Sequence, residues 1–201
     1  MKRIGIYGGS FDPVHKGHRL LAENLSKEIN ADKVFIIPAA VSPFKKGSFA
    51  SDEDRLIMCK LAFSEDLFEI SDLEIRRGGK SYTVDTVNEI KKLYPEDKLY
   101  LFMGDDMLLS FHKWYKYDEI LKLCTLVCGG RSGDWEKHSQ MKEYAENVLK
   151  LNKDEIVICE SEPIEISSTE IRESLKNGEA DFLNGNVYEY IKKRGLYCEQ
   201  R

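Results

Sequence analysis

The sequence predicts a doubly wound α/β fold with a mostly parallel sheet and a small helical segment at its C-terminal end. Three observations support this prediction: short apolar runs, amphipathic patterns of helical period between them, and turn-forming residues where the two meet. Strands of a parallel sheet are buried on both faces, and a strand–helix–strand order implies right-handed crossovers. Because ligands bind such sheets at the carboxyl ends of the strands, functional residues are expected just after strands.

The predicted strands are five apolar runs bounded by turns, at residues 2–7, 33–39, 98–104, 124–130 and 155–161. The predicted helices rest on apolar residues at helical spacing: Leu20, Leu21, Leu25 and Ile29; Leu56, Met58, Leu61 and Ala62; Val84, Val87, Ile90 and Leu93; and Tyr144, Val148 and Leu151. A chain of 201 residues without repeats or an obvious linker predicts one domain, spanning residues 1–201.

The amino-acid composition limits the kinds of molecule that this protein is expected to bind. With 30 Lys and Arg against 35 Asp and Glu, the net charge of −5 argues against a nucleic acid, whose phosphates need a basic face. No apolar run approaches the length of a membrane span, so no membrane partner is expected. The five cysteines are dispersed and form no CxxC pair, which predicts reduced thiols in the core of a cytoplasmic protein. Oligomeric state stays open, with a homo-oligomer among the alternatives.

The stretch GGSFDPVHKGH lies between the first predicted strand and a helix. Gly8 and Gly9 are expected to let the backbone turn sharply and approach a ligand closely. The helix starting near Gly17 offers unpaired N–H groups and the positive end of its dipole, which suits phosphate. His15 and His18 lie three residues apart and are expected to converge on one anion.

Two other interpretations of this stretch compete with the anion site. In the first, Ser10 and Asp12 merely cap the turn and the two histidines are ordinary surface residues. In the second, the histidines bind zinc, but no third ligand or HExxH pattern is nearby. The spacing fits neither the GxGxxG dinucleotide fingerprint nor the GxxxxGK[ST] P-loop.

A second unusual stretch is IEISSTEIRESL. Ser167 and Glu170 have the spacing of a capping box, so a helix is expected to start there. Arg172 then lies near the helix start, where the dipole disfavours a cation. Either neighbouring acidic residues compensate for this charge, or Ser168, Thr169 and Arg172 hold a polyphosphate at the helix N-terminus.

Together, GGSFDPVHKGH and ISSTEIR resemble the paired signature of nucleotidyltransferases that carry an HxGH motif and an ISST-x-[IL]-R motif. From end to end the chain is similar to one branch, the bacterial nicotinate-nucleotide adenylyltransferases. The similar stretches are residues 42–47, 71–87, 102–121, 129–133 and 190–197. The resemblance implies a Rossmann-like fold and an enzyme of NAD biosynthesis that joins nicotinate mononucleotide to ATP, releasing pyrophosphate, with Mg²⁺ as cofactor.

The resemblance also implies the site residues. The ATP site would comprise Gly8, Gly9, Ser10, Phe11, His15, His18, Gly104, Asp106, Ser167, Ser168, Thr169 and Arg172, of which His15, His18 and Arg172 are catalytic. His18 would face the α-phosphate. No protein nucleophile or covalent intermediate is needed, because the acceptor phosphate, with a second pKa of about 6, attacks directly. Mg²⁺ would bridge phosphates rather than bind a protein carboxylate cluster, so no metal ligand is assigned.

The acceptor site is expected around SYTVDT and HKWY. Thr83 is expected to cap a helix, so that it and neighbouring amides present donors at a positive helix end. Such donors suit a carboxylate better than an amide, which favours nicotinate over nicotinamide. Trp114 either stacks on the pyridine ring or packs within the helical layer. The full acceptor set is Lys45, Tyr82, Thr83, Trp114 and Arg131, with Lys45 and Arg131 toward phosphate.

One departure weakens the prediction for the acceptor phosphate. Phe44 precedes Lys45 where many relatives have a histidine. The adjoining polar segment 45–55 is expected to be mobile and to become ordered when substrate arrives.

Two classes of alternative remain. Within the enzymes, a related adenylyltransferase could act on nicotinamide mononucleotide or phosphopantetheine. A tRNA synthetase fits less well, since the chain lacks room for an anticodon domain and has no KMSKS-like motif. Outside the enzymes, a nucleotide sensor could keep the fold and bind without turnover.

Overall fold

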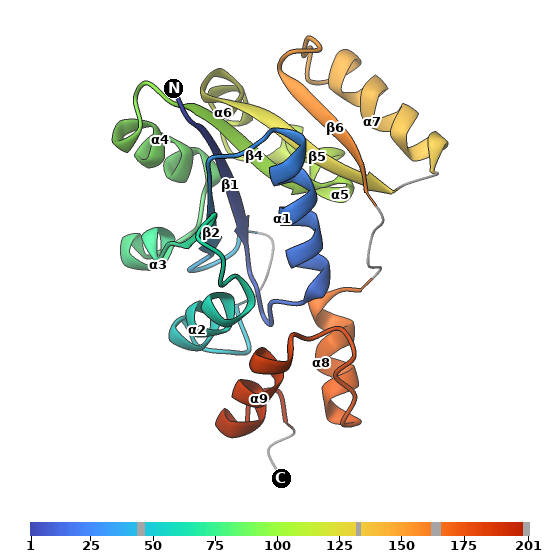
Figure 1. Cartoon of the computed structure of the whole chain (residues 1–201). Coiled ribbons are helices and arrows are strands. Elements are labelled where there is room, and N and C mark those ends of the chain that lie inside the picture. The colour runs from blue at the N-terminus through green and yellow to red at the C-terminus, as the bar shows by residue number, and fades with distance from the viewer. Residues whose placement is uncertain (44–46, 132–133, 162–165, 199–201) are drawn as a thin grey trace.

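The structure is a computed structural model that describes residues 1–43, 47–131, 134–161 and 166–198. Its strands are β1 (Arg3–Gly9), β2 (Lys33–Pro38), β3 (Phe68–Ile70), β4 (Lys98–Gly104), β5 (Cys124–Arg131) and β6 (Ile156–Ser161). Its helices are α1 (Lys16–Glu28), α2 (Asp52–Ala62), α3 (Leu73–Arg77), α4 (Thr83–Leu93), α5 (Asp105–Leu108), the 3₁₀ helix η1 (Phe111–Lys113), α6 (Tyr117–Leu123), α7 (Trp135–Asn147), α8 (Ser168–Lys176) and α9 (Gly185–Arg194). Figure 1 shows strands and helices alternating along the chain.

The six strands form one sheet in the order β3-β2-β1-β4-β5-β6, and each described pairing is parallel. The order reverses between β1 and β4, because the chain first winds outward to β3 and then returns to the other side of β1. The doubly wound prediction is therefore confirmed. Gly9 ends β1 and Gly104 ends β4, so the switch point lies between the carboxyl ends of these two strands.

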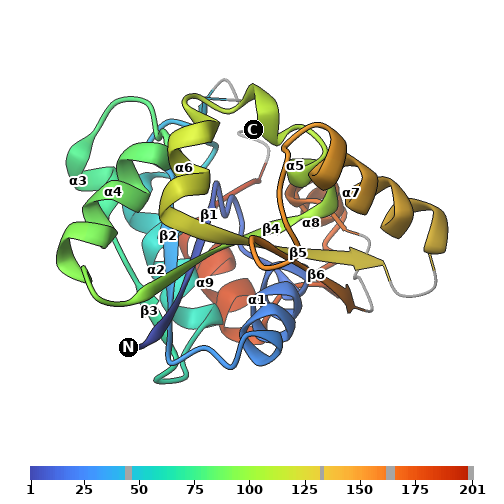
Figure 2. The same ribbon diagram turned by 90° about the horizontal axis from the view of Figure 1, so that it is seen from above.

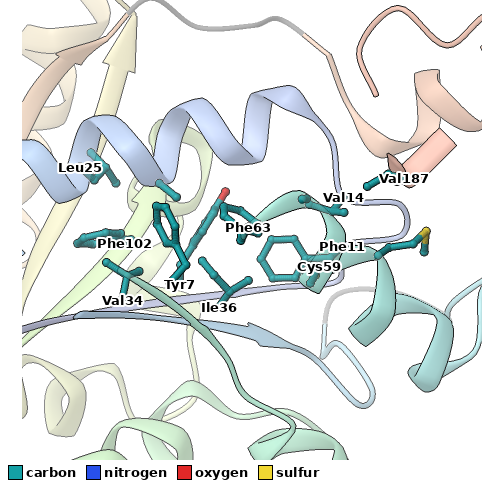
Figure 3. Close-up of a cluster of buried hydrophobic side chains, with 14 of the residues drawn as sticks. Tyr7, Phe11, Val14, Leu25, Val34, Ile36, Cys59, Phe63, Phe102 and Val187 are labelled. Carbon is teal, nitrogen blue, oxygen red and sulfur yellow. The ribbon is translucent and has the colours of Figure 1, made fainter. Parts of the chain in front are cut away.

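Alternate residues of the strands face two hydrophobic clusters, one on each side of the sheet. On β1, Ile4 and Ile6 face a cluster with α4 and α6, which we term the α4-side cluster. Tyr7 faces the other, the α1-side cluster, together with residues of α1 and α2. Figure 2 shows the sheet between these two layers of helices, and Figure 3 shows Tyr7, Phe11 and Phe102 among the side chains of the α1-side cluster.

The two C-terminal helices belong to the α1-side cluster. Ile171 of α8 and Val187 and Ile191 of α9 are buried there with residues of α1 and α2. Burial of such aliphatic side chains contributes about 1.5–3 kcal/mol each. The predicted helical C-terminal segment thus packs under the carboxyl ends of the strands.

Several details of the predicted elements were wrong. The three-residue strand β3 was not predicted, because a run this short at the sheet edge has no clear period. Strand β1 extends to Gly9 rather than ending at residue 7, since Gly8 and Gly9 pair with Ile37 and Pro38 of β2. Leu93 is 68% exposed and Val148 47% exposed, so neither belongs to a buried helix stripe.

The cysteines largely follow the prediction. Cys59, Cys124, Cys128 and Cys159 are buried free thiols, but Cys198 is exposed, so the core assignment was wrong for that residue. Burial raises the pKa of Cys124 to about 12, which keeps this thiol protonated and unreactive. Within the described part of the chain, no helix is long and apolar enough to cross a membrane.

Candidate active site

The turn after β1 is made by Phe11 rather than by the glycines. Phe11 has a left-handed backbone with φ of 46°, and its buried ring lies 5.0 Å from the ring of His18. Gly8 and Gly9 remain extended within β1, so the prediction that they form the turn was wrong. A Cβ atom at Gly8 would meet no described atom within 4 Å, whereas one at Gly9 would lie 3.1 Å from the Phe11 ring. Gly8 therefore leaves space at the end of the strand.

The two histidines cap the first turn of α1 for each other. The N–H of His18 donates to Nδ1 of His15 at 3.4 Å, and the N–H of His15 donates to Nδ1 of His18 at 3.3 Å. The two rings lie 3.6 Å apart between centroids. His15 is buried, so the alternative in which Ser10 and Asp12 cap the turn beside surface histidines is wrong. Because each Nδ1 accepts a hydrogen bond, each neutral ring carries its proton on Nε2, where it is a donor.

Helix α8 binds directly to the turn that leads into α1. Ser167 and Glu170 form the predicted capping box. The Ser168 hydroxyl donates to the Pro13 carbonyl at 3.0 Å, although the two residues lie 155 positions apart. Arg172 donates from Nη1 to the Asp12 carbonyl at 2.6 Å. Figure 1 shows the start of α8 beside the loop that leads into α1.

This docking brings the predicted phosphate-binding groups together. Arg172 also donates from Nη2 to the Thr169 hydroxyl at 3.0 Å, so its guanidinium lies over the start of its own helix. Two helix N-termini, those of α1 and α8, thus lie on one turn with two imidazoles and one guanidinium. Their N–H groups and dipoles favour a polyanion at this place.

A buried carboxylate that sequence reasoning assigned only to a cap organises this turn. Asp12 is 4% exposed and accepts from the N–H groups of Phe49 and Ala50 at 2.7 and 3.1 Å. Phe49 places its ring 4.3 Å below the Arg172 guanidinium. Phe49 and Ala50 are therefore held by hydrogen bonds, and helix α2 begins at Asp52; the mobility of this segment stays a prediction.

Arg55 is a functional candidate that sequence reasoning missed. It is fully buried on α2 and donates from Nη1 to the Ser10 carbonyl at 2.8 Å and from Nη2 to the Ala39 carbonyl at 2.6 Å. It therefore ties the turn after β1 to the loop after β2. The sequence did contain a signal for Arg55, a lone arginine on the apolar face of a predicted helix. A charge at such a position is expected to need polar partners in the interior.

On the acceptor side, helix α4 begins one residue earlier than predicted. Tyr82 is the N-cap and makes no side-chain cap bond, so Thr83 is the first helical residue rather than the cap. The Tyr82 ring lies 4.7 Å from that of Tyr115, which brings the start of α4 next to the segment after η1. Trp114 is half-buried, 5.0 Å from the Phe111 ring, and packs against the α4-side cluster.

A buried network lies beneath this helix start. The Thr86 hydroxyl donates to Oε1 of Glu74 at 2.6 Å, and the Ala40 N–H donates to the Ser81 hydroxyl at 2.9 Å. Desolvation by burial raises the pKa of Glu74 above its ordinary value, although hydrogen bonds from Thr86 and Ser81 oppose the shift. These bonds connect the loop after β2 to α3 and α4.

The end of β4 lies on the other side of the switch point from the end of β1. A Cβ atom at Gly104 would meet no described atom within 4 Å, as at Gly8. Asp106 follows with a side chain that is 84% exposed, and Nζ of Lys137 lies 3.6 Å from it and 2.7 Å from Asp105. Two predicted acceptor contacts, Lys45 and the side chain of Arg131, lie outside the described residues. No group of three His, Cys, Asp or Glu side chains that could hold a metal occurs among the described residues.

The fold and the site define a nucleotidyltransferase of the α/β class. The cytidylyltransferase-like family model matches residues 6–174, which span both helix N-termini of the site. Among curated proteins, one from Dehalococcoides mccartyi is 37% identical over 98% of both chains, and one from Aquifex aeolicus is 44% identical over 82% of this chain and 98% of its own. Both carry the name "Probable nicotinate-nucleotide adenylyltransferase". The chain belongs to this family of nicotinate-nucleotide adenylyltransferases.

Solved structures agree on the fold. The nicotinic acid mononucleotide adenylyltransferase of Plasmodium falciparum, complexed with NaAD, superposes with a TM-score of 0.78 over 98% of both chains at 21% identity. The same enzyme complexed with APC gives a TM-score of 0.76 at 19% identity. Because the sequence identity to these two structures is low, the structural similarity establishes the fold alone.

Proposed function

We propose that this chain transfers the adenylyl group of ATP to the phosphate of nicotinate mononucleotide, forming nicotinate adenine dinucleotide and pyrophosphate. The observation that carries the proposal is the contact between Arg172 and the Asp12 carbonyl at 2.6 Å. It sets the guanidinium beside the turn that leads to His15 and His18. Membership of the family supports the choice of substrates.

In this proposal the donor triphosphate lies across the N-termini of α1 and α8. The Nε2–H donors of His15 and His18 face the α- and β-phosphates, and Arg172 and Thr169 face the leaving pyrophosphate. Because these groups are held by main-chain and side-chain hydrogen bonds before substrate arrives, they need little reorganisation as negative charge builds up. The ring of Phe11 is buried, so only its backbone would contact ATP. Gly8 and Gly104 leave room at the switch point.

The acceptor is placed at the start of α4 in this proposal. Thr83 and the first amides of α4 would receive the carboxylate of nicotinate at the positive end of the helix dipole. Tyr82 and Trp114 would border the pyridine ring. The acceptor phosphate attacks the α-phosphorus in line, the bond to the bridging oxygen breaks, and pyrophosphate leaves with both electrons of that bond. Direct attack needs no covalent enzyme intermediate.

Mg²⁺ and a cytoplasmic location complete the proposal. Asp105 and Asp106 lie near the switch point but share Lys137, so the described residues fit a protein-bound magnesium site poorly. The ion's ligands would therefore be phosphate oxygens and water, as is common for nucleotide-bound Mg²⁺. All five cysteines are free thiols, which fits a reducing compartment.

The test is an assay of the purified full-length chain with ATP, MgCl₂ and one acceptor at a time. We expect pyrophosphate release and a dinucleotide of the correct mass with nicotinate mononucleotide. Nicotinamide mononucleotide and phosphopantetheine should react with much lower kcat/KM. Equal efficiency with the nicotinamide compound would contradict the carboxylate assignment, and ATP binding without pyrophosphate release would identify a sensor instead.

A further inference from the structure

The buried carboxylate of Asp12 accepts hydrogen bonds from two distant parts of the chain. Besides the N–H groups of Phe49 and Ala50, it accepts from the hydroxyl of Tyr197 at 2.7 Å, across 185 positions of sequence. The carboxylate is nearly inaccessible to solvent, so each of these donors replaces water that it lost on folding. The end of the chain is therefore part of the environment of the turn after β1.

Tyr197 has a strained backbone conformation, and its hydroxyl reaches the Asp12 carboxylate from there. Helix α9 ends at Gly195 in the left-handed conformation, with φ of 63°, and Tyr197 is also left-handed with φ of 62°. Glycine adopts this conformation readily, whereas a bulky residue does so at a cost that surrounding contacts must offset. On the other side of the hydrogen bond, Phe11 next to Asp12 is left-handed as well. Phe11 and Tyr197 thus both have an unfavourable backbone conformation, and they lie on opposite sides of the same hydrogen bond.

The hydroxyl of Tyr197 stays protonated and remains a donor at any ordinary pH. Desolvation by burial raises its pKa, and the neighbouring negative charge of Asp12 raises it further. Tyr197 is therefore the donor in this hydrogen bond, and the Asp12 carboxylate is the acceptor.

Asp12, Phe49 and Arg172 form a closed circuit of contacts. The Asp12 carboxylate fixes the backbone of Phe49, the Phe49 ring supports the Arg172 guanidinium from below at 4.3 Å, and Arg172 donates back to the Asp12 carbonyl at 2.6 Å. Phe49 is 76% exposed, so burial contributes little to the position of its ring. Its position depends on the backbone hydrogen bond to Asp12, and Tyr197 shares that same carboxylate.

We propose that Tyr197 is a positioning residue for Arg172, and that it acts through Asp12 and Phe49 to aim the guanidinium at the triphosphate. The inference rests on the proposed function, in which Arg172 binds ATP. Loss of the Tyr197 hydroxyl leaves the Asp12 carboxylate held only by the N–H groups of Phe49 and Ala50, so its orientation is less firmly fixed. The backbone of Phe49 then loosens, and Arg172 loses the surface on which it lies.

The same C-terminal segment supplies a matched control. Tyr190 of α9 donates its hydroxyl to Oδ1 of Asp54 at 2.7 Å, the same distance and the same kind of partner. Asp54 lies on α2 and also accepts from Arg194 at 3.0 Å. Tyr190→Phe therefore removes an equivalent tyrosine–aspartate bond that does not reach the Asp12 circuit.

The experiment compares Tyr197→Phe and Tyr190→Phe in the full chain by steady-state kinetics and thermal unfolding. We expect Tyr197→Phe to raise KM for ATP about fivefold, the effect of one lost hydrogen bond, with KM for nicotinate mononucleotide within about twofold of wild type. Tyr190→Phe should lower the melting temperature similarly while leaving both KM values unchanged. Equal effects of the two variants on KM for ATP would overturn the proposal.

A double-mutant cycle with Arg172→Lys tests the route of the effect. If Tyr197 acts through Arg172, Tyr197→Phe should raise KM for ATP by less than about twofold in the Arg172→Lys background. Full additivity would mean that Tyr197 acts elsewhere. Phe49→Leu keeps the backbone N–H but removes the ring, and should reproduce the ATP effect even if Tyr197→Phe folds poorly; an unchanged KM for ATP would reject the circuit.

The two proposals can fail separately. If the wild-type chain makes no dinucleotide, the proposed function is wrong. Calorimetric titration of the same variants with ATP then still measures whether Tyr197 and Arg172 are coupled.

Discussion

His15 and His18 each accept the backbone N–H of the other through Nδ1, with ring centroids 3.6 Å apart. This reciprocal cap uses the nitrogen nearest the backbone of both rings. It leaves Nε2 as the donor of each neutral ring and fixes the position of each ring relative to the other. A structural and a chemical role are therefore combined in the same pair.

We expect His18→Ala to lower kcat about 10²–10³-fold, as when one donor to a developing charge is lost. It should also lower the free energy of unfolding by about 1 kcal/mol, since one cap bond is removed. Stopped assays and denaturant titrations measure the two effects. His112→Ala, which alters an exposed histidine of η1, is the control and should leave kcat unchanged. A wild-type kcat in His18→Ala would remove His18 from the chemistry.

We expect Thr83→Val to weaken acceptor discrimination more than ATP binding, because it removes a hydroxyl donor at the start of α4 without changing the size of the side chain. The ratio of kcat/KM for nicotinate over nicotinamide mononucleotide should fall about fivefold, the value of one hydrogen bond. Thr125→Val on β5 is the matched control. An unchanged ratio in Thr83→Val would place the carboxylate elsewhere.

Asp54 should stabilise the fold at neutral pH and lose this effect in acid. Desolvation raises its pKa, but hydrogen bonds from Ser51, Tyr190 and Arg194 outweigh burial and hold the pKa below its ordinary value of 3.8. A lowered carboxyl pKa gives stability that is present above the unfolded-state value and lost as the pH falls through the folded one. Asp54→Asn should therefore cost about 1.5–3 kcal/mol at pH 7.

Denaturant titrations from acid to neutral pH test this expectation. The difference between wild type and Asp54→Asn should be constant well above pH 3.8 and should shrink below that value. Glu96→Gln, at an exposed carboxylate, should show little difference at any pH. A difference that does not change with pH would mean that the charge of Asp54 contributes nothing.

Glu74 should behave in the opposite sense. Burial raises the pKa of this carboxyl above its ordinary value of 4.5, against hydrogen bonds from Thr86 and Ser81 and the charge of Arg77. The folded chain then binds more protons than the unfolded chain above pH 4.5, so wild type should lose stability relative to Glu74→Gln as the pH rises from there. The slope is at most about 1.4 kcal/mol per pH unit. If wild type instead gained stability relative to Glu74→Gln as the pH rises, folding would favour the charged carboxylate and the prediction would be wrong.

Local sequence patterns correctly predicted features that depend only on residues close together in the chain. The capping box of Ser167 and Glu170 depends on residues three apart, and it was predicted correctly. The start of α4 was displaced by one residue, because Thr83 is a good cap by type but Tyr82 occupies that position. The short strand β3 was missed because pairing with β2, rather than its own three residues, makes it a strand.

The sequence by itself determined the order of the five longer strands, the two phosphate-binding motifs and the kind of chemistry they serve, since periodicity and capping act over a few residues. Only the tertiary structure decided that Phe49 and Tyr197 meet on Asp12 and that Arg55 joins Ser10 to Ala39. These bonds connect segments up to 185 positions apart. They exist because α2, α8 and α9 pack on one hydrophobic cluster, and no short stretch of sequence specifies which distant donors that packing brings to a buried carboxylate.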